Sequence, residues 1–575
     1  MSAAAVLGRV AAVLAVVLAI ILLLALGIGC AGAQAPAPVA AVTSEIEARF
    51  RRDDSLAAWG VRDSAQIAAQ ASAFRGWSAR LAAILPTELP DATARSRLAA
   101  LRGFVDAAMA TNVCRFDLWN VDQLFGFHVQ LAQSAASEPL GTEAARERLL
   151  RAAKRFPTAV RWQIANLQAG VAAGFTAPHA NVERVVDQLD GMLADNGAVL
   201  LSPLQRDSAS SFATAWRAVL RDSIVPALRR YRDYLTPGYA AKARPEPGLT
   251  ALPNGPACYS AIVYQATTIR LDLDSVYAVA VAKRVETLAE ITTLGRRMFG
   301  EGIATVDILR KARTDPQFVM HDPDSIMAAY TRTVVRARAL LPLQFASTPD
   351  APLVVRATPK EQAAAAAPAR YLQAPEDGSA PAVFVVNAYQ PGGIAVMNIE
   401  LGTAHEAYPG HHFQFVYAAK QRAAGGAPDF LSNGAYLEGW GIYAEQLADE
   451  AGLYEQQITR LGYLIHRLDV YMALQCDIGI HAFGWSRQQA IDTMMVVAGR
   501  PLAQAASYAD RHAASPGQLA TYGVGYLTIT GAREKAERRM GKRFDLKGFH
   551  AVVLGDPGVT LPELERTVAE WSAAP

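Results

Sequence analysis

The spacing of apolar residues along the chain is mostly that of amphipathic helices. Between about residues 43 and 239 apolar positions recur at helical intervals among Ala, Arg and Glu, as in EARERLLRAAKRF and VERVVDQLDGMLADNGAVLL. The same period returns in LDSVYAVAVAKRVETLAEITTLGRRMFG and through most of residues 401–575. The pattern therefore predicts a mainly α fold.

Turn and breaker residues interrupt this pattern in two places. TPGY and PEPGLTALPNGP, between residues 236 and 256, indicate a boundary between an N-terminal helical region, 34–245, and a second helical region, 246–575. Later, AVFVVNAY at 382–389 is rich in β-branched and aromatic residues and predicts a strand. GIAVMNIEL, across the turn PGG, is its expected partner.

The first 33 residues have the composition of a signal peptide or a membrane anchor. Arg9 precedes an uncharged apolar run long enough to cross a bilayer, and the small residues Ala31-Gly32-Ala33 follow it. We expect export to the periplasm or cell envelope, either with cleavage before Gln34 or with membrane attachment through the uncleaved segment.

The amino-acid composition, net charge and cysteine count exclude some classes of function. Hydrophobic residues make up 51% of the 575 residues and charged residues 19%, which is typical of a globular protein. The net charge of +2 and the lack of a basic stripe argue against a nucleic-acid partner. If Cys30 leaves with the signal, Cys114, Cys258 and Cys476 remain, enough for one disulfide and one free thiol.

The decapeptide HEAYPGHHFQ, residues 405–414, is the strongest candidate for chemistry. On a regular helix His411 would lie about 240° round from His405, and His412 would lie on the same face but roughly 10 Å along the axis. Neither pair could bind one metal ion. Pro409 lacks an N–H and must break or bulge the helix, while Gly410 permits a turn. With this interruption, His405 and His411 can share a metal.

A third ligand is available downstream, in NGAYLEGWGIYAEQLADE. Glu438 lies 27 positions after His411 and is followed by Gly439, which allows a close backbone approach. Glu445 is two helical turns further on the same face. We expect Glu438 to be the ligand and Glu445 to orient a ligand or serve the fold.

Two imidazoles and a carboxylate are a donor set for catalytic Zn2+, which keeps an open position for water. Glu406 would take a proton from that water and pass it to the leaving group. Candidates for stabilising the oxyanion are His481, Arg511, and either Tyr522 or Tyr526. The isolated histidines 466, 512 and 550 are expected to be structural.

Several ordered motifs give the chain a resemblance to a known family. HEAYPGHHFQ, AYLEGWGIYAEQLADEAGLY, DIGIHAFGWSRQQAI, SPGQLATYGVG and FDLKGFHAVVLGDPGVTLPELE occur in this order. They resemble DUF885, a bacterial domain family of unknown function marked by HExxPGHH. The resemblance implies a helical, zinc-metallopeptidase-like body with a deep cleft and a small β-sheet beside the metal helix. Carried over by motif, it implies a metal centre of His405, Glu406, His411 or His412, and Glu438, flanked by Asp477, His481, Arg511 and Tyr522.

The sequence thus predicts an exported zinc-dependent hydrolase, a metallopeptidase acting on peptide substrates. One alternative is a non-catalytic peptide-binding protein that retains the fold, although such a protein has no need of Glu406. Another is a zinc hydrolase of a different amide or ester, which the same activated water could serve.

Overall fold

The computed structural model confirms the mainly α class. It describes residues 37–574 except 57–58, 139, 195–196, 208–209, 349–350, 361–362, 364–366, 376–379, 424–430, 432 and 556–559. Helices account for 74% of the chain, and the strands form only small sheets. The segment 1–33, predicted to be a signal or anchor, lies outside the described residues. Within the described part of the chain, no helix combines the length and apolar character needed to cross a bilayer.

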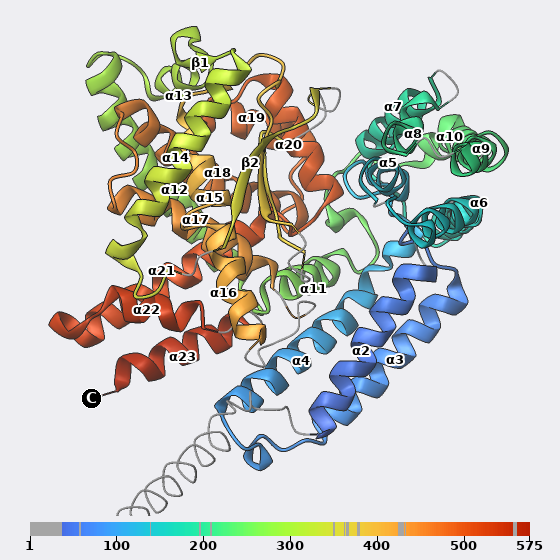
Figure 1. The fold of residues 1–575 in the computed structure, drawn as a ribbon, viewed down its shortest axis with the longest axis horizontal. Coiled ribbons are helices and arrows are strands. Elements are labelled where there is room, and N and C mark those ends of the chain that lie inside the picture. Colours follow the sequence, from blue (N-terminus) through green and yellow to red (C-terminus); the bar gives the residue numbers. More distant parts are fainter. Residues whose placement is uncertain are drawn as a thin grey trace, which may run out of the picture.

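The elements follow one another in three groups of helices, with strands inserted in the last (Figure 1). The first two groups are α2 (Ala37–Leu56), α3 (Ser64–Ala82), α4 (Ala92–Ala110), then α5 (Phe127–Ser137), α6 (Glu143–Ala172), α7 (His179–Leu193), α8 (Ser202–Arg206), α9 (Ser210–Val219) and α10 (Val225–Tyr234). The third group is α11 (Gly255–Thr267), α12 (Leu273–Phe299), α13 (Thr305–Thr314), β1 (Val319–Met320), α14 (Pro323–Gln344), β2 (Leu353–Ala357), β3 (Ala369–Leu372), β4 (Ala382–Val386), β5 (Ile394–Ala395), α15 (Met397–Glu406), α16 (His411–Ala423), α17 (Gly434–Glu450), α18 (Gln457–His481), α19 (Arg487–Ala498), α20 (Leu502–Ala514), α21 (Ala520–Met540), α22 (Leu546–Val553) and α23 (Leu561–Ala573).

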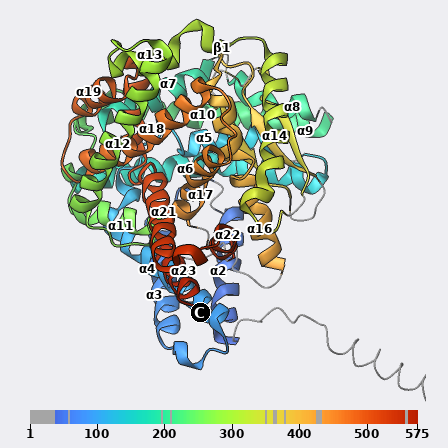
Figure 2. The same ribbon diagram turned by 90° about the vertical axis from the view of Figure 1, so that its left-hand side faces the viewer.

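Helices α2 to α4 form an arm with its own apolar core. Asp63 caps the N-terminus of α3 in a capping box with Gln66, and Asp91 caps α4. Trp77 and Leu101 are buried between the helices. Figure 2 shows the arm projecting below the rest of the molecule.

The two larger groups of helices have separate cores that meet near the predicted boundary at residue 245. The core of α5 to α10 ends along the chain at Tyr239, and the core of α11 to α23 resumes at Leu249. Cys114, Trp119 and Phe175, which precede the boundary, nevertheless belong to the second core. The division into regions 34–245 and 246–575 therefore stays a prediction.

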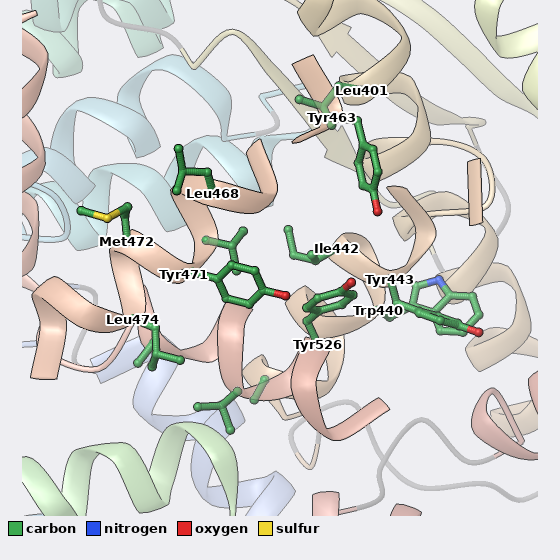
Figure 3. Close-up of a cluster of buried hydrophobic side chains, with 14 of the residues drawn as sticks. Leu401, Trp440, Ile442, Tyr443, Tyr463, Leu468, Tyr471, Met472, Leu474 and Tyr526 are labelled. Atoms are coloured by element: carbon green, nitrogen blue, oxygen red, sulfur yellow. The ribbon is translucent and has the colours of Figure 1, made fainter. Parts of the chain in front are cut away.

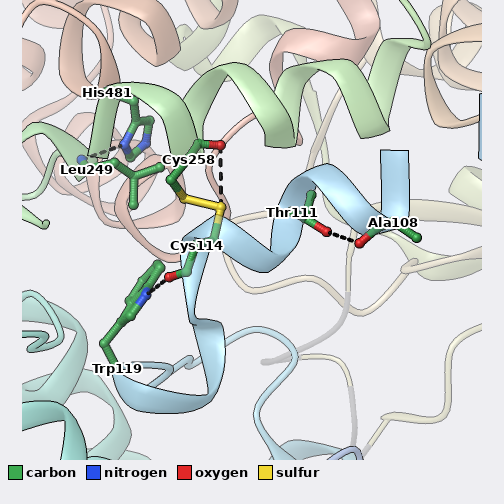
Figure 4. The surroundings of a disulfide bond; sticks show 7 residues. All are labelled: Ala108, Thr111, Cys114, Trp119, Leu249, Cys258 and His481. Atoms are coloured by element: carbon green, nitrogen blue, oxygen red, sulfur yellow. Dashed lines mark hydrogen bonds between the residues drawn. A yellow bond between two sulfur atoms is a disulfide. The ribbon is translucent and has the colours of Figure 1, made fainter. Parts of the chain in front are cut away.

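One disulfide joins the N-terminal part to the second core (Figure 4). Cys114 follows the arm and bonds to Cys258 in α11, while the indole N–H of Trp119 donates to the carbonyl oxygen of Cys114 at 2.9 Å. Cys476 is a free, buried thiol on α18. One disulfide and one thiol are what the cysteine count allows.

The predicted strand at 382–389 is present, but its predicted partner is wrong. Strand β4 is buried along its whole length, between β2, which is parallel to it, and β3, which is antiparallel. Ile394 pairs instead with Met320 of β1. Gly392 and Gly393 adopt positive φ, and a Cβ on Gly393 would lie 2.5 Å from the carbonyl oxygen of Met320. These glycines turn the chain against β1, after which α15 begins.

Helix α18 is the central support of the second core. Nineteen of its 25 residues are buried, and α12, α15, α17 and α21 all pack against it. Figure 3 shows Tyr471 of α18 beside Tyr526 of α21, with ring centroids 6.4 Å apart. Helices α15, α17 and α21, which carry the candidate site, therefore rest on one buried helix.

Loss of the disulfide is expected to lower thermal stability. Cys114 and Cys258 are 144 residues apart, and closing a loop of this length stabilises the folded state by roughly 5 kcal/mol in the chain-entropy model. A Cys114→Ser, Cys258→Ser double variant should unfold several degrees below wild type in calorimetry. Reduced wild type should show the same decrease, and an unchanged midpoint in both samples would contradict the structural role of this bond.

Candidate metal centre

The helix that begins at Met397 stops one residue after His405, as the proline predicts. The next two backbone N–H groups, of residues 407 and 408, both donate to the carbonyl oxygen of Thr403, and the helix resumes as α16 at His411. Pro409 has no N–H to continue the ladder. A Cβ on Gly410 would lie 1.8 Å from the carbonyl oxygen of His405, so only glycine allows the chain to fold back here.

This interruption brings three possible metal ligands together. One donor atom from each of His405, His411 and Glu438 lies within 4.8 Å of the other two. Oε2 of Glu438 is 3.6 Å from Nε2 of both histidines, which is too long for a hydrogen bond. This oxygen is buried and has no hydrogen-bond partner. A buried carboxylate oxygen without a donor fits the position of a cation.

The outer nitrogens of both histidines are already occupied. Nδ1 of His405 lies 2.8 Å from Oε1 of Glu445, and Nδ1 of His411 lies 3.3 Å from Oε1 of Gln414. A carboxylate or amide oxygen at Nδ1 favours the tautomer with its proton there and leaves the lone pair on Nε2. Both Nε2 atoms therefore face Glu438 as potential ligand atoms.

Glu445 extends the site to His466, a histidine whose isolated position in the sequence predicts a structural role. Its second oxygen lies 2.8 Å from Nδ1 of His466 on α18, so one buried carboxylate holds His405 and His466 together. A Cβ on Gly462 would lie 2.6 Å from Cβ of Met397, so this glycine lets α18 approach α15 closely, one turn before His466. No local sequence signal announces His466, because its position depends on this helix contact.

The electrostatics of the site favour a positive charge. Burial opposes protonation of His405, but the carboxylates of Glu438, Glu445 and Glu406 raise its pKa well above the ordinary value. Burial raises the pKa of Glu438, yet His405 and His411 lower it overall. Three carboxylates around two imidazoles create a place where a cation is stabilised, either a proton or a metal ion.

The carboxylate of Glu406 lies at the edge of the three-stranded sheet. Its Oε2 accepts the backbone N–H of Tyr371 in edge strand β3 at 2.9 Å. The predicted sheet beside the metal helix is thus present, but the strand next to that helix is β3 rather than the central strand β4.

Of the two adjacent histidines, the structure brings only His411 to the cluster. The ring nitrogens of His412 lie 3.3 Å from the hydroxyl of Tyr371 and 3.3 Å from the carbonyl oxygen of Ala351. Burial lowers the pKa of His412 to about 4.

Tyr522 also lies at the cluster. Its ring stacks on that of His405 with centroids 6.5 Å apart, and burial together with the nearby Glu438 carboxylate raises the pKa of its hydroxyl, so it stays protonated. The alternative, Tyr526, donates to Gln446 at 2.8 Å. A Cβ on Gly439 would lie 2.3 Å from the backbone of Gly525, so these glycines let α17 and α21 cross closely and bring Tyr522 to Glu438.

The match to known families covers nearly the whole chain. The model of the family described as "Bacterial protein of unknown function (DUF885)" matches residues 43–568. The chain belongs to the DUF885 family.

Two solved structures share the fold of this DUF885 member. A candidate lipoprotein from Colwellia psychrerythraea has a TM-score of 0.79 at 22% identity, over 87% of this chain and 90% of that one. A candidate lipoprotein of unknown function from Shewanella oneidensis has a TM-score of 0.69 at 18% identity, over 88% of this chain and 93% of that one. No curated protein matches the chain.

Within this DUF885 fold, His481 belongs to a different network. Its Nδ1 accepts the backbone N–H of Leu249 at 3.3 Å, and its Nε2 lies 2.9 Å from the carbonyl oxygen of His512. His512 in turn contacts the carboxylate of Asp477, which also accepts from the hydroxyl of Tyr259 at 2.7 Å. Both ring nitrogens of His481 are taken by backbone groups, so the ring has no free N–H for an oxyanion, contrary to its predicted role.

Arg511, at the end of α20, is the remaining predicted residue. Its Nη2 donates to Oε1 of Gln518 at 2.8 Å, and its positive charge acts on the neighbouring Tyr522 to lower the pKa of that hydroxyl, against the larger effect of burial. Arg511 thus lies beside the cluster, on the side of Tyr522.

If the cluster binds zinc, substituting Gly441 should disturb the candidate metal centre without unfolding the helix. A Cβ at this position of α17 would lie 2.6 Å from the ring of His405, so Gly441→Ala must displace that ring. We expect zinc affinity to fall by about 10- to 100-fold, as for other changes that misplace a ligand. Gly531→Ala is the matched control, because a Cβ on that helical glycine meets nothing within 4 Å. Equal zinc affinities in competition titrations would contradict the placement of His405.

The stability of the metal-free protein should depend on His481 below neutral pH. Burial lowers its pKa to about 4, against about 6.5 in an unfolded chain. Between these values only the unfolded state takes up the proton, so the free energy of unfolding falls as the pH falls from 6.5 towards 4. Urea unfolding at pH 7 and 4.5 should show roughly 2 kcal/mol less acid destabilisation in His481→Gln than in wild type. An identical pH dependence in both proteins would refute a neutral buried His481.

Proposed function

We propose that this chain is an exported zinc-dependent hydrolase and most specifically a metallopeptidase. The observation that carries the proposal is the convergence of two Nε2 atoms and one unpartnered carboxylate oxygen, from His405, His411 and Glu438. This is the donor set of catalytic zinc sites with three protein ligands. The buried Glu445, which orients His405, supports the proposal because ligand histidines usually donate their other N–H to such a group.

The groups around the ligands fit hydrolysis by an activated water. A zinc ion held by these three side chains would keep one position open for water and lower the pKa of that water to about 7. Glu406 directly follows a ligand, and its carboxylate is half-buried beside β3, where it can accept a proton from the water and transfer it to a leaving amine.

Two side chains are suited to stabilise the charge that develops on the substrate carbonyl oxygen. Tyr522 stays protonated and lies against Glu438. His466 is held through Nδ1 by Glu445, with about a third of its side chain exposed. Tyr522 can donate a hydrogen bond to an oxyanion, and His466 can donate one from Nε2 when its imidazole carries both protons. We assign them this role in place of His481.

Export is supported by the apolar segment at residues 1–33 and by the similarity of the fold to two candidate lipoproteins. A soluble peptide substrate in the cell envelope fits this location. Two alternatives are a non-catalytic peptide binder and a zinc hydrolase of another amide or ester. Substitution of Glu406 tests the first, and assays on different substrates test the second.

Metal analysis and activity together test the proposed function. Purified wild type should contain one zinc per chain, and His405→Ala, His411→Ala and Glu438→Ala should lose it. Glu406→Gln should retain the zinc and lose hydrolysis of unstructured peptides by about 10²- to 10⁴-fold, the usual contribution of a general base.

His412→Ala is the control for these ligand variants, because its ring lies against Tyr371 and Ala351 rather than in the cluster. It should keep its zinc. Full zinc content in the ligand variants would refute the ligand set, and undiminished hydrolysis by Glu406→Gln would refute the mechanism.

A further inference from the structure

Arg511 has no acidic partner in the described part of the chain, unlike the four arginines that bind Asp510 and Asp469. Asp510, the preceding residue, is bound by Arg184 and Arg487, and the buried Asp469 is bound by Arg313 and Arg500. Among the residues that the structure describes, no carboxylate lies within ion-pair distance of Arg511. Its hydrogen bond goes to the neutral amide of Gln518.

A short series of polar contacts connects Arg511 to the candidate metal centre. Gln518 accepts from Arg511 and also contacts Tyr522, and Tyr522 lies against the ligand Glu438. The half-buried guanidinium is thus separated from the metal ligands by two side chains. An extended peptide advances about 3.5 Å per residue, so a carboxylate recognised across two intervening side chains is expected to lie only a few residues beyond the scissile bond.

The three carboxylates at the site, by contrast, each have a role in the proposed function. Glu445 is shared by His405 and His466, Glu438 faces the two ligand histidines, and Glu406 accepts from Tyr371. In the proposed function Glu438 binds the metal and Glu406 transfers a proton, while Glu445 is held by two histidines. None of these three carboxylates is then left for a substrate amino group, whereas Arg511 has no assigned partner of opposite charge among the described residues. This favours recognition of a free carboxyl terminus over a free amino terminus.

We infer that Arg511 binds the terminal carboxylate of the substrate, so that the enzyme removes only a few residues from the carboxyl end of peptides. The inference rests on the proposed function and assigns its substrate class. Guanidinium and carboxylate match as a planar, charge-assisted pair with two parallel hydrogen bonds, which gives this arginine selectivity as well as affinity. Arg511 then acts as a specificity-determining residue rather than as an oxyanion donor.

The first test compares zinc-loaded wild type on two N-acetylated heptapeptides that differ only in a free or an amidated carboxyl terminus. We expect kcat/KM to be about 10- to 100-fold higher on the free acid, because a hydrogen bond to a charged group typically changes affinity by a factor of this size. Arg511→Gln should remove this preference by slowing the acid only, and Arg511→Lys should restore part of it. Arg538→Gln, an exposed residue further along α21, is the control and should match wild type.

Binding provides a second readout that does not need turnover. Zinc-loaded Glu406→Gln should bind the free acid about 10- to 100-fold more tightly than the amide in calorimetry, and adding Arg511→Gln should abolish the difference while zinc content stays the same.

Each failure has a distinct meaning. Equal rates and equal binding for acid and amide, or an equal loss on both in Arg511→Gln, would overturn the inference while leaving a zinc peptidase. Arg511-dependent cleavage of an amidated peptide with an internal aspartate would also overturn it, because Arg511 would then bind a side-chain carboxylate instead of the terminal one. Loss of the proposed function itself would instead appear as wild type that binds no zinc.

Discussion

The candidate site depends on a single constraint, the interruption of one helix between His405 and His411. On a continuous helix the two imidazoles would point in different directions, and Glu438 would have no pair of nitrogens to face. Pro409 prevents the helix from continuing, and Gly410 lets the chain pass against the carbonyl oxygen of His405. The fold also fixes this irregular turn from outside, because the indole N–H of Trp440 donates to the carbonyl oxygen of Pro409 at 3.0 Å.

The rest of the molecule holds three helices close to this turn. Helix α18 supplies a buried surface, and glycines at the crossings let backbones approach where a side chain would collide. Gly441 faces the ring of His405, Gly439 meets Gly525 of α21, and Gly462 meets Met397 of α15. These contacts bring together three side chains from different helices around His405: Glu438, Tyr522 and His466. A buried carboxylate, Glu445, then fixes two imidazoles at once, which is a common way to set the orientation of ligand histidines.

Much of this arrangement could be predicted from the sequence, because it follows from local rules. Helical periodicity predicts the fold class, and the Pro-Gly pair predicts the break in the helix. The positions of Glu438 and Glu445 on one helix face predict one candidate ligand and one residue that orients a ligand. The family resemblance is confirmed by the match over residues 43–568. The cysteine count limited the chain to one disulfide, which the structure places between Cys114 and Cys258.

What could not be predicted depends on contacts between distant elements. His466 looks like an ordinary helix histidine until α18 meets α15 at Gly462, and His481 looks available until the loop at Leu249 and the end of α20 cover both of its nitrogens. Strand β3 is only four residues long and follows a low-complexity stretch, so local pattern did not reveal that it, rather than β4, borders Glu406.

The most direct test of the central claim is the coordination shell of zinc bound to the full-length protein, measured by X-ray absorption at the zinc edge. If His405, His411 and Glu438 hold the ion, the spectrum should show two imidazole nitrogens and carboxylate oxygen at about 2.0 to 2.2 Å, with one imidazole fewer in His411→Ala and no change in His412→Ala. A shell with a single imidazole in wild type, or one that loses an imidazole only in His412→Ala, would contradict this ligand set.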